Sequence, residues 1–195
     1  MNKKGFTLIE LLAAIVILGI IMTVALPNVF RIMSESKADK YIDDAKKLIS
    51  NADYKMRTNS SYIKKPSGNK CVVMTLSYLD GPEFDVAPEG GQYDREYSYV
   101  IIKSNGGVYS YIVSLVEDVN AGKKTKDGNA IKSNKTSFKG ISLATEADLK
   151  NKNVRGKVDG IPSNKIKLYK DYTTGCNSSN WIVYSLDKDQ AATRP

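Results

Sequence analysis

The side chains that most often carry catalysis or bind metals are scarce in this sequence. Its 195 residues include no histidine, so the commonest general base and metal ligand is missing. The carboxylates are scattered, and the sequence has no phosphate-binding glycine loop, serine-hydrolase elbow or zinc-protease motif. We therefore predict a protein that is not an enzyme, with no catalytic residue, metal site or cofactor.

The two cysteines, Cys71 and Cys176, could form one disulfide bond. They lie 105 positions apart, and neither has the spacing of a metal ligand. Paired outside the cell, they would close a loop worth roughly 4–5 kcal/mol in the chain-entropy treatment. The alternative is two free, buried thiols, and the sequence leaves both open.

Glu10 is the residue whose position most needs an explanation. It stands at the start of a long apolar stretch, and Leu11 to Phe30 are twenty residues without a charge. As a helix, these twenty residues would span roughly 30 Å, the thickness of a bilayer core. An ionised carboxylate there is costly unless it reaches the headgroups or finds a partner.

The residues before this stretch are basic, but they do not form an ordinary secretory signal. Lys3 and Lys4 supply the positive start, yet no small-residue cleavage site follows the apolar run. Ala13 and Ala14 lie in the middle of the run, where they are typical helix residues. Cleavage behind the apolar stretch is therefore not indicated, and a membrane anchor with its amino end inside is the simplest interpretation.

Residues 5–10 read Gly-Phe-Thr-Leu-Ile-Glu, follow Lys3-Lys4 and precede the apolar run. This stretch closely resembles the class III signal of type IV pilins, over residues 1 to about 30. The resemblance implies that a prepilin peptidase cuts between Gly5 and Phe6, and that the new amino terminus at Phe6 is N-methylated. It also implies that Glu10 pairs with the amino terminus of a neighbouring subunit.

The physical chemistry of these residues agrees with that implication. A cut after Gly5 places a cationic amine at the amino end of a helix, where the helix dipole disfavours it. Helices bundled with an axial offset would let Glu10 of one subunit meet the Phe6 amine of another. Because an unpaired charge in the packed core would cost several kcal/mol, the pair would penalise wrong registers. Apolar packing of Leu8 to Leu26 would supply most of the assembly energy.

The helical pattern continues far beyond the apolar run and predicts one helix from about Phe6 to Arg57. Apolar residues recur at three- and four-residue steps in its second half. They are Ala38, Tyr41, Ile42, Ala45, Leu48, Ile49, Ala52 and Met56. The charged residues expected on the other face include Asp39, Lys40, Asp43, Asp44, Lys46 and Lys47. Such a helix needs an apolar environment first and a globular domain second.

Gly19 and Pro27 interrupt the apolar half of this helix. Proline removes a backbone hydrogen bond, so Pro27 is expected to kink or break the helix, unless it is simply a tolerated membrane-helix proline. The pilin resemblance implies that such a segment loosens when the subunit packs in a filament. We expect residues 19–27 to do this.

The rest of the chain predicts a head built on an antiparallel sheet. Strands are expected over residues 71–79, 97–103, 108–116, 166–169 and 181–186. The turn at Ser104 to Gly107 joins the second and third as a hairpin. Residues 117–139 are expected to be irregular, and residues 144–152 a short helix capped by Thr145. With the long helix this is an α+β fold, as the pilin resemblance also implies.

The predicted organisation is a leader at 1–5, a hydrophobic transmembrane and filament-core helix at 6–30, and a head at 31–195. The chain would be a single-pass protein of the cytoplasmic membrane before assembly and part of an extracellular pilus afterwards. The partners implied are further copies of the chain, other pilins, the prepilin peptidase and the membrane platform that assembles pili. The filament would serve adhesion, twitching motility or aggregation, and could contact a host surface or DNA.

Two other functions fit the same N-terminus. A pseudopilin of a secretion or competence system carries the same signal, although this head is larger than expected for small pseudopilins. An uncleaved anchored protein with a binding ectodomain would need no cut at Gly5. The net charge of +8 does not separate these readings, because the lysines are spread along the chain and indicate a solvated surface.

Overall fold

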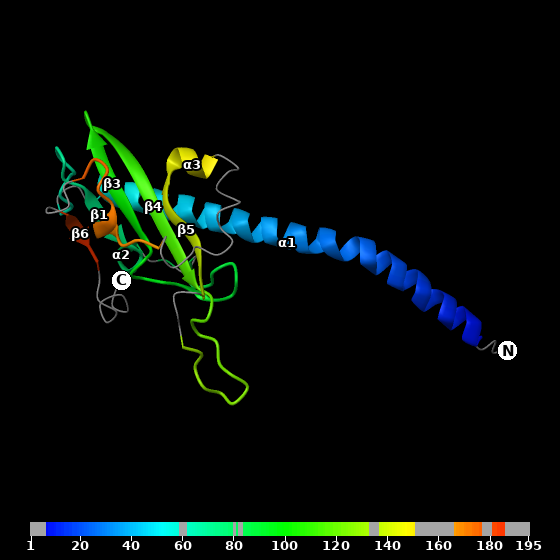
Figure 1. Ribbon diagram of the computed structural model, residues 1–195. Coiled ribbons are helices and arrows are strands. Elements are labelled where there is room, and N and C mark those ends of the chain that lie inside the picture. The colour runs from blue at the N-terminus through cyan, green and yellow to red at the C-terminus, as the bar shows by residue number, and fades with distance from the viewer. Residues whose placement is uncertain are drawn as a thin grey trace. The chain divides into compact units, whose positions relative to one another are not determined.

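The computed structural model describes residues 7–58, 62–79, 81, 84–132, 137–150, 166–176 and 181–185. Its first element is the helix α1 (Leu8–Thr58), which confirms the long helix predicted from the sequence (Figure 1). The chain divides into two compact units, the first ending at Lys37 and the second beginning at Ala38. The second unit is the head.

The part of α1 inside the head packs through a stripe of eight apolar residues, which are those that the sequence predicts at three- and four-residue steps. All eight apolar stripe residues, from Ala38 to Met56, are buried. One residue assigned to the opposite, charged face is not solvated, because Asp44 is only 1% exposed. Its carboxylate accepts hydrogen bonds from Tyr93 Oη (2.8 Å) and Lys40 Nζ (3.0 Å), and these offset the cost of burying the charge.

The remaining elements of the head are short helices and strands (Figure 1). In chain order they are β1 (Val72–Thr75), α2 (Leu76–Leu79), β2 (Gln92–Tyr93), β3 (Tyr99–Asn105), β4 (Val108–Asp118), β5 (Phe138–Thr145), α3 (Glu146–Lys150), the 3₁₀ helix η5 (Tyr169–Asp171) and β6 (Ile182–Tyr184).

One mixed sheet contains the six named strands. β4 pairs with β3 along residues 108–114 and with β5 along residues 112–118. Ile112 and Val113 pair with both neighbours, so β3 and β5 lie on opposite sides of β4. β1 follows β3, and β6 follows β1. The pairings are antiparallel except that of β1 with β6, which is parallel. The α+β fold is therefore as predicted, with one parallel pairing added to the antiparallel sheet.

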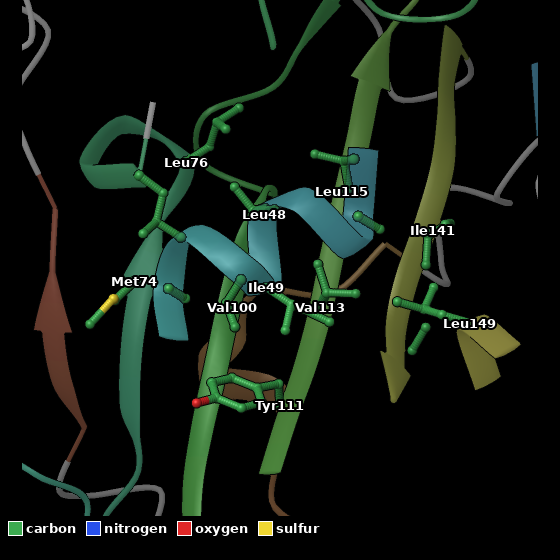
Figure 2. Packing of buried hydrophobic residues seen from close by; sticks show 14 of the residues in the cluster. Leu48, Ile49, Met74, Leu76, Val100, Tyr111, Val113, Leu115, Ile141 and Leu149 are labelled. Atoms are coloured by element: carbon green, nitrogen blue, oxygen red, sulfur yellow. The ribbon is translucent and has the colours of Figure 1, made fainter. Parts of the chain in front are cut away.

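The main core lies between the sheet and the Ala38–Met56 stripe of α1. Leu48 and Ile49 of the helix pack among Val100, Val113 and Leu115 of β3 and β4 (Figure 2). Alternate residues of these strands face the helix, as the period of two in a strand requires. Ile141 of β5 and Leu149 of α3 extend the same cluster. The predicted cap of α3 is present, since Thr145 Oγ1 accepts from Asp148 N at 3.2 Å.

A second buried carboxylate ties the helix to the sheet. Glu117 of β4 is fully buried and accepts hydrogen bonds from the backbone N–H groups of Gly91 (2.8 Å) and Glu89 (3.1 Å) and from Tyr41 Oη. Burial raises the pKa of the nearby Tyr93 phenol, and the charge on Asp44 raises it further. These donors let the carboxylates of Asp44 and Glu117 lie in the core, which a hydrophobic pattern alone does not predict.

β5 was not predicted, because residues 117–139 were expected to be irregular and residue 144 to be helical. The structure shows strand from Phe138 to Thr145 and the start of α3 at Glu146. A β-bulge explains why the sequence pattern did not predict this strand. Ser142 and Leu143 lie opposite the single residue Ser114, and Leu143 takes a positive φ of 53°. The extra residue shifts the alternation by one, so the pattern no longer resembles a strand.

Gly140 is required beside this bulge. Its φ is +135°, and a Cβ there would lie 2.1 Å from the carbonyl oxygen of Leu115. We expect Gly140→Ala to lower the free energy of unfolding of the head by roughly 3 kcal/mol or more, because it combines backbone strain with a clash. Gly128 is the matched control, since its φ is +80° and no atom lies within 4 Å of the added Cβ.

Urea unfolding of the two variants measures this difference. Gly128→Ala should lose only the roughly 1–2 kcal/mol of a left-handed alanine. Equal losses of unfolding free energy in the two variants would contradict the close contact between Gly140 and the Leu115 carbonyl of β4.

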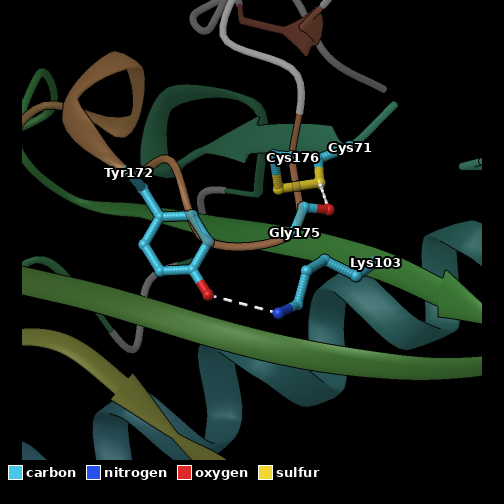
Figure 3. The surroundings of a disulfide bond; sticks show 5 residues. All are labelled: Cys71, Lys103, Tyr172, Gly175 and Cys176. Atoms are coloured by element: carbon cyan, nitrogen blue, oxygen red, sulfur yellow. Dashed lines mark hydrogen bonds between the residues drawn. A yellow bond between two sulfur atoms is a disulfide. The ribbon is translucent and has the colours of Figure 1, made fainter. Parts of the chain in front are cut away.

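The other face of the sheet is covered by residues from the carboxy-terminal part of the chain. Cys71, just before β1, forms a disulfide with Cys176, with the two Cα atoms 5.6 Å apart (Figure 3). Nearby, Lys103 Nζ lies 3.2 Å from Tyr172 Oη, as Figure 3 also shows. A cluster forms around the bridge from Val73, Tyr99, Ile101 and Ile112, with Leu143, Tyr169, Tyr172 and Trp181 packed against it.

Two strand predictions near this face were wrong in part or entirely. Residues 76–79 form α2 instead of continuing β1, and residues 166–169 are not a strand. In place of a ladder, Tyr169 stacks edge-on against Tyr99 and Trp181, with ring centroids 5.9 and 5.7 Å apart. Ile166 and Tyr169 therefore cover the sheet with their side chains, and the segment adds no strand pairing.

Candidate functional site: the amino-terminal helix

The amino-terminal part of α1 carries a large apolar surface that its own chain leaves uncovered. Its large apolar side chains from Leu8 to Met33 are all about half exposed or more. They are Leu8, Ile9, Leu11, Leu12, Ile15, Val16, Ile17, Leu18, Ile20, Ile21, Met22, Val24, Leu26, Val29, Phe30, Ile32 and Met33. By length and composition, this helix could cross a membrane. Such a surface requires lipid or other apolar helices around it.

Glu10 lies in the first turn of this helix and is bound by Thr7. The backbone N–H and the hydroxyl of Thr7 donate to the same Glu10 oxygen, Oε2, at 2.9 and 2.8 Å. The Thr7 hydroxyl oxygen in turn accepts the Glu10 N–H at 3.3 Å. This is a capping box, in which the first and fourth residues satisfy each other's polar groups. An acidic side chain here also matches the helix dipole.

The capping box leaves one carboxylate oxygen of Glu10 available. Both Thr7 donors reach Oε2, and no residue in the described part of the chain donates to Oε1. The carboxylate is therefore held in a fixed orientation by one oxygen while the other can accept a cation or a hydrogen-bond donor. Thr7 was missed in the sequence analysis, although the spacing Thr-x-x-Glu before an apolar run is the signal of a capping box.

Pro27 lies inside α1, and the helix continues through it without a break. Proline lacks the N–H that would bind the carbonyl of Thr23. Two side chains bond to backbone on either side of this gap. The Thr23 hydroxyl donates to the Ile20 carbonyl at 2.7 Å, and the Asn28 amide donates to the Val24 carbonyl at 3.3 Å. Both accepting carbonyls lie near the Thr23 carbonyl, and neither of these two bonds replaces the one that Pro27 removes.

Gly19 has open space beside it, because no atom lies within 4 Å of an added Cβ. Gly5 and Phe6, the residues of the predicted cut, lie outside the described residues. The disulfide of Cys71 and Cys176 belongs to the head and not to this site.

The described residues hold no group of three histidine, cysteine, aspartate or glutamate side chains that could bind a metal ion. The chemistry available at the amino-terminal helix is therefore that of one carboxylate, its capping threonine and an apolar surface. The apolar surface can insert the helix into an apolar environment, and the carboxylate can align it against a partner that carries a positive charge.

A family profile described as the prokaryotic N-terminal methylation motif matches residues 1–26. The match covers Gly5, Phe6, Thr7, Glu10 and Gly19. The N-terminus is that of a type IV pilin-like prepilin. Neither a curated protein nor a solved structure matches the chain.

The prepilin motif explains the arrangement of the helix. It implies processing by a prepilin peptidase and assembly into pilus-like filaments, and the apolar helix fits anchoring in a membrane. A prepilin needs a helix that is stable in lipid before assembly and among other helices afterwards. The exposed apolar surface of Leu8 to Met33 suits both environments, since neither requires a polar face.

Proposed function

We propose that this chain is a structural subunit of a type IV pilus. It enters the cytoplasmic membrane as a prepilin, is cut between Gly5 and Phe6, is N-methylated at Phe6, and packs its apolar helix into a surface filament. The observation that carries the proposal is the methylation motif joined to an apolar helix whose first turn holds a single oriented carboxylate.

The free oxygen of Glu10 supports an intermolecular pairing. Thr7 occupies Oε2, so a neighbour's Phe6 amine would approach Oε1 without displacing the cap. The cap holds the side chain in one position before the neighbour arrives, which lowers the entropy cost of pairing. Between apolar helices the pair would be strong, and leaving either charge alone would cost several kcal/mol.

The helix around Pro27 supports the expectation that residues 19–27 loosen on packing. The carbonyl of Thr23 lacks its usual donor, and the Thr23 and Asn28 side chains already bond to carbonyls of this segment. Opening a few backbone hydrogen bonds there costs less than in an uninterrupted helix. Gly19, with open space beside it, would let a neighbouring helix approach closely.

A pseudopilin of a secretion or competence system carries the same N-terminal motif, and an uncleaved anchor would share the apolar helix. The first experiment therefore tests the cut itself. Replacing Gly5 with valine should block the peptidase, so that the chain stays in the membrane fraction with its leader attached. The wild-type chain should be shorter by five residues and should be recovered from filaments sheared off the cell surface.

A matched control is Gly19→Val, which introduces the same side chain outside the cleavage site. It should leave cleavage unchanged, whatever it does to filament packing. If the wild type also keeps its leader and stays in the membrane fraction, as Gly5→Val is expected to do, the chain is an uncleaved anchor and the proposal fails.

A further inference from the structure

Asn28 is an exposed amide side chain in the apolar half of α1, directly after Pro27. Its N–H donates to the Val24 carbonyl at 3.3 Å, which is long for a hydrogen bond between nitrogen and oxygen. No group in the described part of the chain donates to its side-chain oxygen. Because a polar atom in an apolar environment is costly unless it is bonded, this oxygen is expected to accept a hydrogen bond when the helix packs.

The backbone N–H groups that follow Pro27 lose their acceptors if residues 19–27 loosen. In the continuous helix α1, the N–H groups of residues 28–31 bond to the carbonyls of residues 24–27. Opening these turns would make the same N–H groups the first donors of a new helix, which have no partner within that helix. Water is absent among packed apolar helices, so an acceptor from the chain itself is needed.

Asn28 is the residue that can supply this acceptor. At the N-cap, the residue that precedes the first turn of a helix, a side-chain oxygen accepts from the backbone N–H two or three positions further on. For Asn28 these are the N–H groups of Phe30 and Arg31. Asparagine is among the residues most preferred at the N-cap, and the cap uses the side-chain oxygen that has no donor in the continuous helix.

Other starting points for the second helix fit less well. A helix with Pro27 at its first position would have Leu26 at the N-cap, and leucine has no acceptor. A helix capped by Thr23 would contain Pro27 at its fourth position, where the first hydrogen bond of the helix would be lost. At the other end of the segment, Gly19 suits the position just after a helix, since glycine readily takes the left-handed conformation found there. The sequence thus has an end signal at Gly19 and a start signal at Asn28.

We propose that Asn28 is a positioning residue that caps the second half of α1 in the filament. The inference rests on the proposed function, because the cap forms only if the segment opens on packing. With α1 continuous, as in the structure, the amide of Asn28 donates to the Val24 carbonyl. In the filament its oxygen accepts from the N–H of Phe30 or Arg31 instead. The opening therefore stops at Asn28, and the helix that enters the head stays intact.

The test compares three variants of the full-length chain, Asn28→Ser, Asn28→Gln and Asn28→Ala, each produced in cells that lack the wild-type copy. Serine is as good an N-cap as asparagine but has no amide, whereas glutamine keeps the amide and is not among the preferred caps. Immunoblotting measures the chain in filaments sheared from the surface and in the membrane fraction. Circular dichroism of the chains purified in neutral detergent micelles measures the helix content before assembly.

Asn28→Ala and Asn28→Gln should lower the ratio of filament to membrane chain about fivefold, the factor expected for the loss of one cap. Asn28→Ser should assemble as the wild type does. All three variants should have the wild-type helix content in micelles, because the continuous helix does not use the cap. Assembly of Asn28→Gln at the wild-type level would show that the amide is used instead of a cap, and would overturn the proposal. A loss in Asn28→Ser as large as that in Asn28→Ala would overturn it too.

Cryo-electron microscopy of wild-type filaments tests the opening itself. In a continuous helix, the axial distance from Leu18 to Ile32 is about 21 Å. Opening three residues would lengthen it by roughly 5 Å, since an extended residue rises more than twice as far as a helical one. We expect the longer distance, with the Asn28 oxygen at hydrogen-bond distance from the N–H of Phe30 or Arg31. An unbroken helix would overturn the cap, while filaments of chains cut at Gly5 would still support the pilus proposal.

Discussion

Replacing Glu10 with glutamine is expected to abolish surface filaments while the chain still inserts in the membrane. Glutamine keeps a side-chain oxygen that can accept from Thr7, so the capping box is retained. It lacks the negative charge, so a neighbour's amine would be buried unpaired at a cost of several kcal/mol per subunit. We expect the sheared surface fraction to fall at least tenfold, measured by immunoblotting, with an unchanged amount in the membrane fraction.

Thr7→Val is the matched control for the cap. It removes the hydroxyl that donates to Glu10 but keeps the carboxylate and its charge. Losing the cap costs about 1 kcal/mol, so this variant should assemble with a modest loss. Normal filament levels in Glu10→Gln would contradict the pairing. A loss in Thr7→Val as large as in Glu10→Gln would show that orientation, and not charge, is what assembly requires.

Removing the disulfide is expected to destabilise the head by roughly 4–5 kcal/mol as an upper value, since the bridge closes a loop of 105 residues. Replacing both cysteines with alanine keeps a small apolar side chain at two buried positions, so most of the loss should come from the missing cross-link. The pairing of β6 with β1 would be retained in part, because the Ile182 N–H donates to the backbone carbonyl of residue 71 at 3.1 Å, and this bond does not need the sulfur atoms.

Trp181 is a suitable probe for this measurement. It is the single tryptophan of the chain and packs against the cluster around the bridge. Denaturant unfolding followed by its fluorescence should give a lower midpoint for the double variant, and for the wild type after reduction. A change below about 1 kcal/mol in both cases would show that the cross-link does not constrain the unfolded chain.

Elements with regular periodicity could be predicted from the sequence. The long helix follows from apolar residues at three- and four-residue steps, and the hairpin of β3 and β4 follows from two apolar runs around Gly106 and Gly107. In both cases local pattern and tertiary packing agree. The α+β fold class followed from these two elements together.

The missing elements depended on long-range contacts. β5 contains a bulge that breaks its alternation, and residues 166–169 pack aromatic side chains on the sheet without joining it. Asp44 lies in the core because Tyr93, distant in sequence, donates to it. At the candidate site, the position of Glu10 was evident from its apolar surroundings. The Thr-x-x-Glu spacing also indicates the capping role of Thr7, which the sequence analysis did not include.

Intact mass spectrometry of the protein sheared from the outside of cells tests the account most directly. The account predicts a chain that begins at Phe6, carries one extra methyl group on its terminal amine, and contains two cysteines without free thiols. A chain that begins at Met1 and is found in the membrane fraction alone would contradict it, and would leave an anchored protein whose apolar helix never enters a filament.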